Sequence, residues 1–250
     1  MPGLVSGPPV DSMTVAELVQ VAPASALAVY AHPDDPEVSC GGTLARWAAE
    51  GTAVSVCICA EGDKGSLDPT VDTAGLAARR REEVKAAGAV LGVTAHHFLG
   101  YPDGDLEADQ ELRGRLVALI RQLKPEVVLC PDPTAVFFGQ QYANHRDHRV
   151  VGWATLDAVA PAAGNPHYFP DAGAAYQPAT LYLSGTLEPD VWVDITGVVE
   201  QKAQAVACHA SQVGEPGEWL RTVVRQRAEA GGQRAGVEYA EGFRRLQLRA

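Results

Sequence analysis

The sequence has no long apolar run and little positive charge, and both absences exclude classes of protein. No segment approaches 18 consecutive apolar residues, and the N-terminus lacks a basic stretch followed by an apolar core, so we expect neither a membrane-spanning helix nor a secretory signal. Lys and Arg number 20 against 31 Asp and Glu, which gives a formal net charge of -11. This balance argues against a nucleic-acid partner, which would require a basic face, and gives no support for binding to anionic lipid.

Cysteine is also scarce, and its spacing does not suit a structural metal site. The sequence has 5 cysteines, an odd number, and no pair has the spacing of a zinc knuckle. Cys57 and Cys59 lie in an apolar run, where they would share one face of a strand. We therefore expect reduced cysteines that serve as small core residues, and a cytoplasmic protein.

What the sequence has in abundance is an alternation of apolar strands and helices. Buried strands are predicted at 26–31, 53–60 and 126–131, and a short strand at 96–100. Helices are predicted at 42–50, 76–92 and 109–125, and a further helix begins near residue 145. Strands that are apolar throughout are buried on both faces, as in a parallel sheet covered by helices. We expect an α/β fold with a Rossmann-like, mostly parallel sheet and helices on both faces.

The chain is interpreted as a single domain over residues 1–250, with an irregular N-terminal segment at 1–24. The sequence is 46% hydrophobic, which is enough for a large core, and it has no repeat, low-complexity tract or linker. The regular alternation ends near residue 165. Two more strands, at 179–184 and 191–195, and a helix at 196–210 are predicted after it.

The stretch AHPDDPEVSCGG, residues 31–42, places a histidine and two adjacent aspartates directly after the first apolar strand. In open α/β sheets, ligands bind outside the carboxyl ends of the strands. His32 and Asp35 are separated by two residues in a turn that contains proline, and imidazole and carboxylate groups are ordinary ligands of divalent metals. Asp34 could then stay off the metal and face the attacking water. The alternative is that the aspartates only cap the N-terminus of the following helix.

A second stretch, NHRDHR at residues 144–149, follows another apolar strand and a loop, so we expect it at the same edge of the sheet. His145 and His148 are three residues apart, which places both on one face of a first helical turn. One of them can bind a metal ion while the other points toward a substrate.

The two stretches together offer a set of three metal ligands, which are His32, Asp35 and His148. Asp34 and His145 are then left for acid–base chemistry. Two histidines and one aspartate favour zinc over magnesium or calcium, which prefer shells made only of oxygen.

A sequence with these motifs resembles the PIG-L/LmbE-like family of zinc-dependent N-deacetylases. The resemblance covers nearly the whole chain from about residue 26. It rests on AHPDD followed by GGTLA, on HRDH, and on EGDKGS, RRREEVKAAGAVLGV, LGYPDGDL and VDITGVVEQKAQAVACHASQ in the family's order. The family includes deacetylases of N-acetylglucosaminyl-inositol compounds, enzymes of the mycothiol and bacillithiol pathways, and some chitobiose and antibiotic deacetylases.

The resemblance implies a role for each matching residue. It implies that His32, Asp35 and His148 bind one zinc ion per chain, for which other divalent transition metals can substitute. It also implies that Asp34 is the general base and that His145 is the electrophile or acid beside the substrate carbonyl.

The resemblance further places Arg80 as a substrate-binding arginine and Asp103 as a substrate-contacting acid. Both positions have ordinary alternatives. RRREE also fits a solvated helix face, on which Arg79 or Arg81 could be the one that turns inward, and YPDGD is an ordinary turn. His209, in CHASQ, lies at a predicted helix end, where we expect a structural role.

The sequence departs from the family's pattern in both motifs. The usual glutamate after the aspartate pair is replaced by Pro36, with Glu37 one place later, and Arg146 stands where family members often have proline. In the mycothiol-pathway relatives a tyrosine lies two residues before the first histidine of the second motif. That position is Ala143 here, and Tyr142 is one residue further away. A carbonyl-polarising role for Tyr142 and the mycothiol-pathway substrate are therefore less favoured.

The implied reaction is the hydrolytic removal of an N-acetyl group from an N-acetylglucosamine-type amino sugar or glycoconjugate. Zinc would polarise the amide carbonyl while Asp34 accepts the proton of the attacking water. Protonated His145 would stabilise the oxyanion, and Asp147 would orient His145 and raise its pKa. Either Asp34 or His145 could protonate the leaving amine. The implied partners are a small-molecule amino sugar and, by resemblance, further copies of the chain in a homo-oligomer.

Two other functions are considered. An amidase that cleaves a thiol–amino-sugar conjugate would use the same chemistry. A non-catalytic nucleotide-binding Rossmann module would need a glycine-rich turn directly after the first strand, but Gly41 and Gly42 come ten residues too late to fit G-x-G-x-x-G. The sequence does not identify the aglycone or the pathway.

Overall fold

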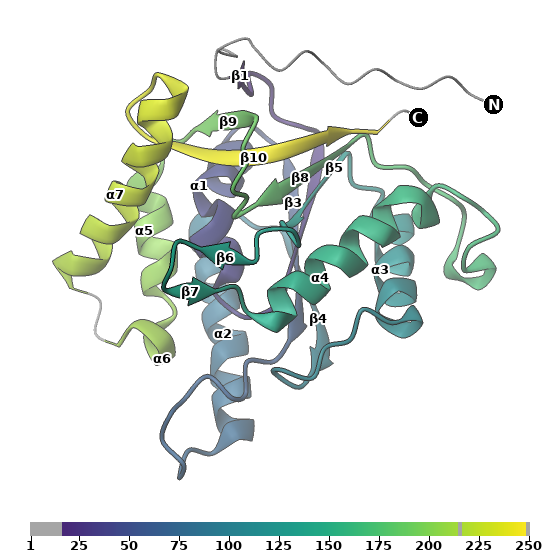
Figure 1. Ribbon diagram of the computed structural model, residues 1–250, viewed down its shortest axis with the longest axis horizontal. Helices are drawn as coiled ribbons and strands as arrows, with labels where there is room; N and C mark the ends of the chain where they lie inside the picture. The colour runs from purple at the N-terminus through teal and green to yellow at the C-terminus, as the bar shows by residue number, and fades with distance from the viewer. Residues whose placement is uncertain (1–16, 215–216, 249–250) are drawn as a thin grey trace.

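The computed structural model describes residues 17–214 and 217–248, which form a central sheet with helices on both faces (Figure 1). The strands of this sheet are β1 (Glu17–Leu18), β2 (Ser25–Tyr30), β3 (Ala53–Ala60), β4 (Ala95–Tyr101), β5 (Val127–Pro131), β8 (Thr180–Ser184), β9 (Val191–Asp194) and β10 (Ala240–Gln247). The helices are α1 (Asp35–Ala49), α2 (Thr73–Leu91), α3 (Gln110–Leu123), α4 (Arg146–Asp157), α5 (Val199–Ala207), α6 (Ala210–Val213) and α7 (Glu218–Ala235). A short hairpin, β6 (Phe137–Phe138) and β7 (Tyr142–Ala143), lies apart from the sheet.

The order of the strands places the two sequence motifs side by side. The sheet runs β1-β9-β10-β8-β5-β2-β3-β4, and β2 pairs in parallel with both β3 and β5. Strands β3 and β4 lie on one side of β2, and strands β5 and β8 lie on its other side. Ligands of open α/β sheets bind at such a reversal of strand order, outside the carboxyl ends of the strands. The first motif follows β2 and the second follows β5, so both lie at this point.

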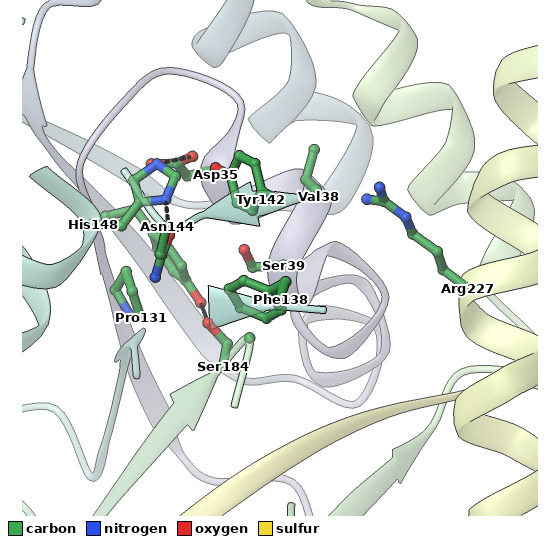
Figure 2. A pocket seen from close by; sticks show the side chains of 12 residues that line it. Asp35, Val38, Ser39, Pro131, Phe138, Tyr142, Asn144, His148, Ser184 and Arg227 are labelled. Atoms are coloured by element: carbon green, nitrogen blue, oxygen red, sulfur yellow. Dashed lines mark hydrogen bonds and ion pairs between the residues drawn. The ribbon is translucent and has the colours of Figure 1, made fainter. Parts of the chain in front are cut away.

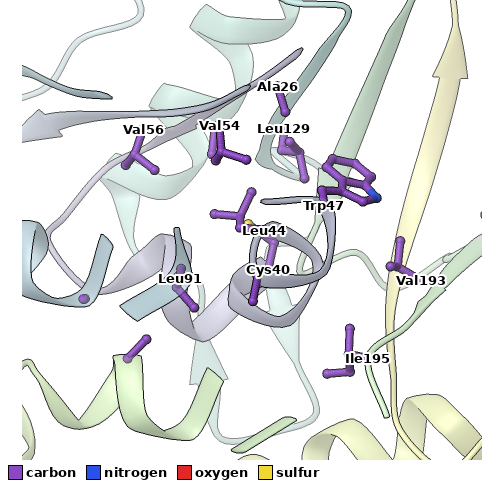
Figure 3. Packing of buried hydrophobic residues seen from close by; sticks show 14 of the residues in the cluster. Ala26, Cys40, Leu44, Trp47, Val54, Val56, Leu91, Leu129, Val193 and Ile195 are labelled. Carbon is purple, nitrogen blue, oxygen red and sulfur yellow. The ribbon is translucent and has the colours of Figure 1, made fainter. Parts of the chain in front are cut away.

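The predicted mostly parallel sheet and its covering helices are confirmed. Helices α1, α2, α5 and α7 cover one face and α3 and α4 cover the other (Figure 1). The apolar side chains of α1 pack with those of β3 and β5 in the first of these layers (Figure 3). Four of the cysteines are buried free thiols and Cys208 is half-buried and free, which confirms their predicted use as reduced residues. No helix within residues 17–214 or 217–248 is both long and apolar enough to cross a membrane.

Helix α1 begins at Asp35, seven residues before the predicted start, because two helical segments join across a kink. Cys40 interrupts the helix with φ -144° and ψ 18°. The backbone N–H groups of Gly42 and Thr43, which follow the kink, donate to the buried carboxylate of Glu241 over 2.9 and 2.7 Å. Lys202 bonds the same carboxylate at 2.6 Å and the carbonyl of Val38 at 2.9 Å. Side chains from α5 and β10 therefore form hydrogen bonds with the backbone N–H and C=O groups beside the kink.

The structure adds elements at both ends of the described chain that the sequence does not predict. β1 pairs with β9 inside the segment predicted to be irregular, while residues 1–16 lie outside the described part. The predicted helix at 196–210 is α5 followed by the short α6. α7 and β10 are not predicted, because their polar and glycine-containing sequences lack clear apolar periodicity. β10 is antiparallel to both β8 and β9.

Candidate active site

The turn after β2 holds the first motif in a conformation that few residues adopt. Asp34 has φ 102° and ψ -26°, a left-handed conformation that costs a non-glycine residue about 1–3 kcal/mol. The backbone N–H of His32 donates to Oδ2 of Asp35 over 2.7 Å and closes the turn. Asp34 occupies the N-cap position of α1, but its side chain makes no capping hydrogen bond to the described residues. Helix capping therefore does not account for the pair of carboxylates.

Donor atoms of three side chains from the two motifs lie close together. Nδ1 of His32 lies 3.2 Å from Nε2 of His148 and 3.6 Å from Oδ2 of Asp35. Nε2 of His148 lies 3.1 Å from Oδ1 of Asp35. Ligands of a tetrahedral zinc ion with bonds of ~2.0–2.1 Å are roughly 3.3 Å apart, and these pairwise spacings are near that value, with each histidine closest to a different oxygen of Asp35. The three side chains could hold a metal.

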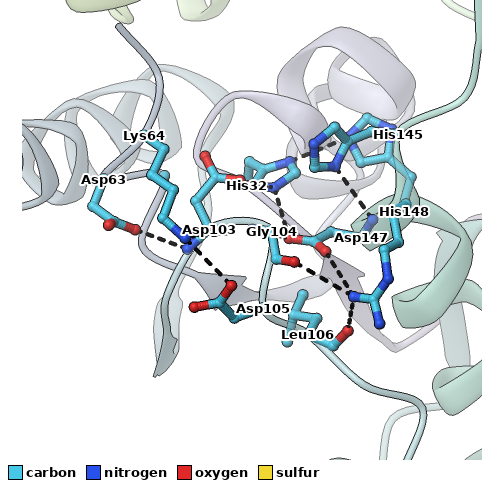
Figure 4. Close-up of polar contacts among 12 residues, drawn as sticks. His32, Asp63, Lys64, Asp103, Gly104, Asp105, Leu106, His145, Asp147 and His148 are labelled. Carbon is cyan, nitrogen blue, oxygen red and sulfur yellow. Dashed lines mark hydrogen bonds and ion pairs between the residues drawn. The ribbon is translucent and has the colours of Figure 1, made fainter. Parts of the chain in front are cut away.

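The second ring nitrogen of each of these histidines also has an oxygen partner. Nε2 of His32 lies 3.1 Å from Oδ1 of Asp103 and 3.3 Å from Oδ2 of Asp147 (Figure 4). Nδ1 of His148 lies 3.0 Å from Oδ1 of Asn144. Histidines that bind metal typically donate their other N–H to such an oxygen, which fixes the tautomer and orients the ring. Both rings are thus held with their inner nitrogens available to a metal.

Other groups of donor atoms are also close together. One group whose atoms lie within 4.8 Å of one another comprises His32, His145 and His148, and another comprises His32, Asp103, His145 and Asp147. Nδ1 of His145, however, already accepts the backbone N–H of Asp147 at 3.2 Å. We favour the set that contains Asp35, because its carboxylate contacts both His32 and His148.

Asp34 lies beside these ligands but does not belong to them. Its Oδ2 accepts a hydrogen bond from Arg80 over 3.3 Å. Burial raises the pKa of Asp34 to about 7, the Asp35 carboxylate adds to the rise, and Arg80 opposes it. Burial also acts to raise the pKa of Asp35, but the charges of His148 and His32 outweigh it and hold that pKa well below its usual range. Adjacent carboxyls with such different pKa values suit different roles.

His145 stands at the N-terminus of α4 with its ring edge-on to His32, the ring centroids being 4.8 Å apart. Since Nδ1 of His145 accepts a hydrogen bond from the Asp147 backbone, the ring proton belongs on Nε2. Desolvation and the nearby His32 lower the pKa of His145, and they outweigh the opposing effect of Asp147. The structure therefore favours a neutral His145 over the protonated one expected from sequence. The carboxylate of Asp147 contacts His32 and accepts the N–H of Gly104 at 2.7 Å.

Of the three arginines in RRREE, the middle one turns inward. Arg80 is only 3% exposed and donates to the carbonyls of Pro33 and Gly62 at 2.5 and 3.0 Å. Arg79 is exposed and Arg81 is partly exposed, and they instead pair with Glu83 and Glu61. Arg80 therefore holds the turn that carries the first motif, while its contact with substrate stays a prediction.

Asp103 and His209 also have defined partners. The backbone N–H of Asp103 donates to Asp63 at 2.8 Å, and its carboxylate contacts His32. Its contact with substrate also stays a prediction. His209 is fully buried with Nε2 3.2 Å from Oε2 of Glu37, so that it links α6 to α1. This position fits the structural role that the sequence predicts for His209.

A cavity of about 400 Å³ opens beside the metal-ligand set (Figure 2). It lies between the start of α1, the β6–β7 hairpin and α7. Asp35 and His148 line one part of it, Phe138 and Tyr142 line another, and the guanidinium of Arg227 points toward it from α7.

Two residues of the site were not found from the sequence. Asn144, the partner of His148, directly precedes His145 in NHRDHR, so its place in the motif was a usable signal. Arg227 has no such signal, because it lies in no motif and on a helix whose sequence lacks clear apolar periodicity.

Comparison of the chain with known proteins gives a family model, a relative and a solved structure that are all named as deacetylases. The family model described as GlcNAc-PI de-N-acetylase matches residues 27–159. A diacetylchitobiose deacetylase from Thermococcus kodakarensis is 35% identical over 87% of this chain and 81% of its own. The solved N,N'-diacetylchitobiose deacetylase of Pyrococcus horikoshii superposes with a TM-score of 0.81 at 29% identity, covering 90% of this chain and 84% of that one. A 4-carboxy-2-hydroxymuconate hydratase from Pseudomonas putida superposes with a TM-score of 0.75 at 26% identity, covering 90% and 97%.

Proposed function

Because the chain belongs to the GlcNAc-PI de-N-acetylase (PIG-L) family, we propose that it is a zinc-dependent hydrolase that removes the N-acetyl group from an N-acetylglucosamine-type amino sugar or glycoconjugate. The observation that carries the proposal is the convergence of His32, Asp35 and His148 at 3.1–3.6 Å, with the separate carboxylate of Asp34 beside them. Hydrolysis of an amide needs both a carbonyl-polarising centre and a base, and this arrangement offers both.

Zinc bound by His32, Asp35 and His148 would supply Lewis-acid polarisation of the amide carbonyl. Asp34 accepts the proton of the attacking water, a role that suits a carboxyl whose pKa is about 7. The N–H at Nε2 of His145 donates to the oxygen on which negative charge develops. The proton taken up by Asp34 is then available for the leaving amine.

Residues outside the reacting groups keep them in position. Arg80 ties the turn of the first motif to the loop after β3, through Pro33 and Gly62. Asp103 and Asp147 hold the outer nitrogen of His32. Such oxygen partners typically change metal affinity or activity by roughly 10–100-fold when they are removed.

Acetate release from a panel of amino sugars tests the proposal. The zinc-loaded protein is expected to release acetate from N-acetylglucosamine, one of its glycosides or diacetylchitobiose. An amidase for thiol conjugates would cleave only acyl groups other than acetate. A hydratase like the Pseudomonas putida relative would add water to a carbon–carbon double bond and release no acetate. The absence of acetate from every member of the panel would therefore reject the proposed function.

Two further features belong to the proposal. The free cysteines support a cytoplasmic location. Assembly into a homo-oligomer rests on the family resemblance alone and stays a prediction.

A further inference from the structure

We propose that the cavity beside the metal-ligand set binds the substituent attached to the amino sugar, and that Arg227 selects a substituent that carries a carboxylate or phosphate group. The inference rests on the proposed function, because it names the class of glycoside that the same site would take.

The cavity connects the reacting groups with a part of the chain far away in sequence. Asp35 and His148, two of the three metal-ligand candidates, line it, so a substrate that reacts there has its remainder nearby. Figure 2 shows Arg227 on the other side of the cavity, reaching from α7 toward Val38 and Ser39. A volume of about 400 Å³ falls within the ~300–1,000 Å³ range of small-molecule sites.

The side chains between these ends are neutral. Ser39, Asn144 and Ser184 offer hydroxyl and amide groups, and the remaining lining is mostly apolar. Asp35 is the one acidic residue among the described residues that line the cavity, and His148 and His32 already contact its carboxylate. The positive charge of Arg227 is therefore not balanced inside the cavity.

Arg227 is an exposed side chain on α7 that lines the cavity, and it differs from Arg225 and Arg234 on the same helix in having no partner among the described residues. Arg225 pairs with Glu200 at 2.6 Å, and the guanidinium of Arg234 lies over the ring of Trp192 at 5.4 Å. Arg227 makes no ion pair or hydrogen bond with any residue in 17–214 or 217–248. Arginine presents a planar fork of N–H donors that matches carboxylate and phosphate oxygens. The chain has a net charge of -11 and therefore repels anions in general. An unpaired arginine in the cavity would attract an anionic group to that one place.

An aromatic pair on the β6–β7 hairpin complements this charge. The rings of Phe138 and Tyr142 lie 5.9 Å apart at 45° to each other, and Tyr142 is 52% exposed. Both line the cavity on the side of the hairpin (Figure 2). Partly exposed aromatic faces can pack against the apolar face of a sugar ring, which would leave its charged substituent directed toward Arg227.

The test compares three glycosides of N-acetylglucosamine that differ only in the substituent: carboxymethyl, 2-phosphoethyl and the neutral carbamoylmethyl. The wild-type enzyme is expected to deacetylate at least one anionic glycoside with a kcat/KM roughly tenfold above that of the neutral one. Most of the difference should lie in KM, because the contact is remote from the reacting bond. The two anionic arms distinguish carboxylate from phosphate, and added salt should reduce the preference.

Variants of Arg227 assign the preference to this residue. Arg227→Gln should bring the charged and neutral glycosides to nearly equal kcat/KM, and Arg227→Lys should retain part of the preference. Arg225→Gln, on the same helix but paired with Glu200, is the matched control and should retain all of it.

Two results would overturn the role of Arg227 while leaving the proposed deacetylase function in place. One is equal kcat/KM for charged and neutral glycosides in the wild type, and the other is a preference that persists in Arg227→Gln. Failure of zinc-loaded wild type to release acetate from any of the three glycosides or from the panel above would instead reject the proposed function, and this inference with it.

Discussion

At the scale of single residues, Asp34 and Asp35 are chemically identical neighbours whose surroundings give them different properties. Asp35 faces two histidines, whose charges keep its pKa well below the usual range despite burial. Asp34 is held in a left-handed conformation beside a buried arginine, and burial raises its pKa to about 7. From the sequence motif AHPDD, the different roles of Asp34 and Asp35 follow only through a family resemblance. The structure supplies a physical reason why the two carboxyls differ in pKa.

The pKa of Asp34 predicts the acid side of the pH profile. A base must be deprotonated, so kcat/KM should fall as the pH drops through about 7. Asp34→Asn should retain zinc and lose roughly 10²–10⁴-fold in kcat, and the residual activity should no longer show this limb. The measurement is the pH dependence of acetate release, with metal content as control. An acid limb that persists unchanged in Asp34→Asn, or loss of zinc from that variant, would assign the base elsewhere.

The tautomer of His145 predicts how its variants behave. If a neutral ring donates from Nε2, His145→Ala should lose roughly 10²–10³-fold in kcat, while His145→Gln, which keeps an N–H donor, should recover part of that loss. Both variants should bind zinc as the wild type does. Equal rates for the two variants would show that hydrogen-bond donation from this position does not contribute, and loss of zinc would make His145 a metal ligand.

At the scale of elements, the kinked helix α1 positions the first motif. The segment before the kink carries Asp35, and the segment after it packs into the core beside Ile195 (Figure 3). Buried Lys202 and Glu241 bind the backbone on the two sides of the kink. The turn that carries the first motif is thus anchored by α5 and β10, which are remote from it in sequence.

The close approach of α1 to Ile195 predicts the effect of a single methyl group. A Cβ at Gly42 would lie 2.7 Å from the Ile195 side chain, whereas a Cβ at Gly197 would meet nothing within 4 Å. Gly42→Ala should therefore lower the free energy of unfolding by about 1–3 kcal/mol, as overpacking does. Gly197→Ala is the matched control and should change it little. Chemical denaturation measures both, and equal stability of the two variants would show that α1 and Ile195 are not tightly packed.

The same elements mark what could be predicted from sequence. β2, β3 and β5 are runs of apolar residues bounded by turns, so pattern alone located them within a residue or two. The kink in α1 depends on Glu241, about 200 positions away, and no local pattern records such a contact. The mixed polar sequence of α7 likewise hid Arg227, whose place at the cavity follows only from the packing of α7.

At the scale of the whole molecule, the topology explains why the two motifs could be predicted to lie together. Parallel pairing of β2 with β5 brings two motifs more than 100 residues apart to one edge of the sheet, and the carboxyl ends of parallel strands were expected to meet there. The proton on His145 and the contact of Asp147 with His32 could not be predicted in this way. They depend on side-chain orientations within a few ångströms.

The most direct test of the central claim is to remove metal from the protein with a chelator and titrate zinc back while following acetate release from the best amino-sugar substrate. If zinc is required, the stripped protein should release no acetate. Activity should return in proportion to added zinc and saturate at one ion per chain. His148→Ala, which lacks one of three proposed ligands, should not regain activity over the same range. Full acetate release by the stripped protein, or normal recovery of His148→Ala, would contradict the account.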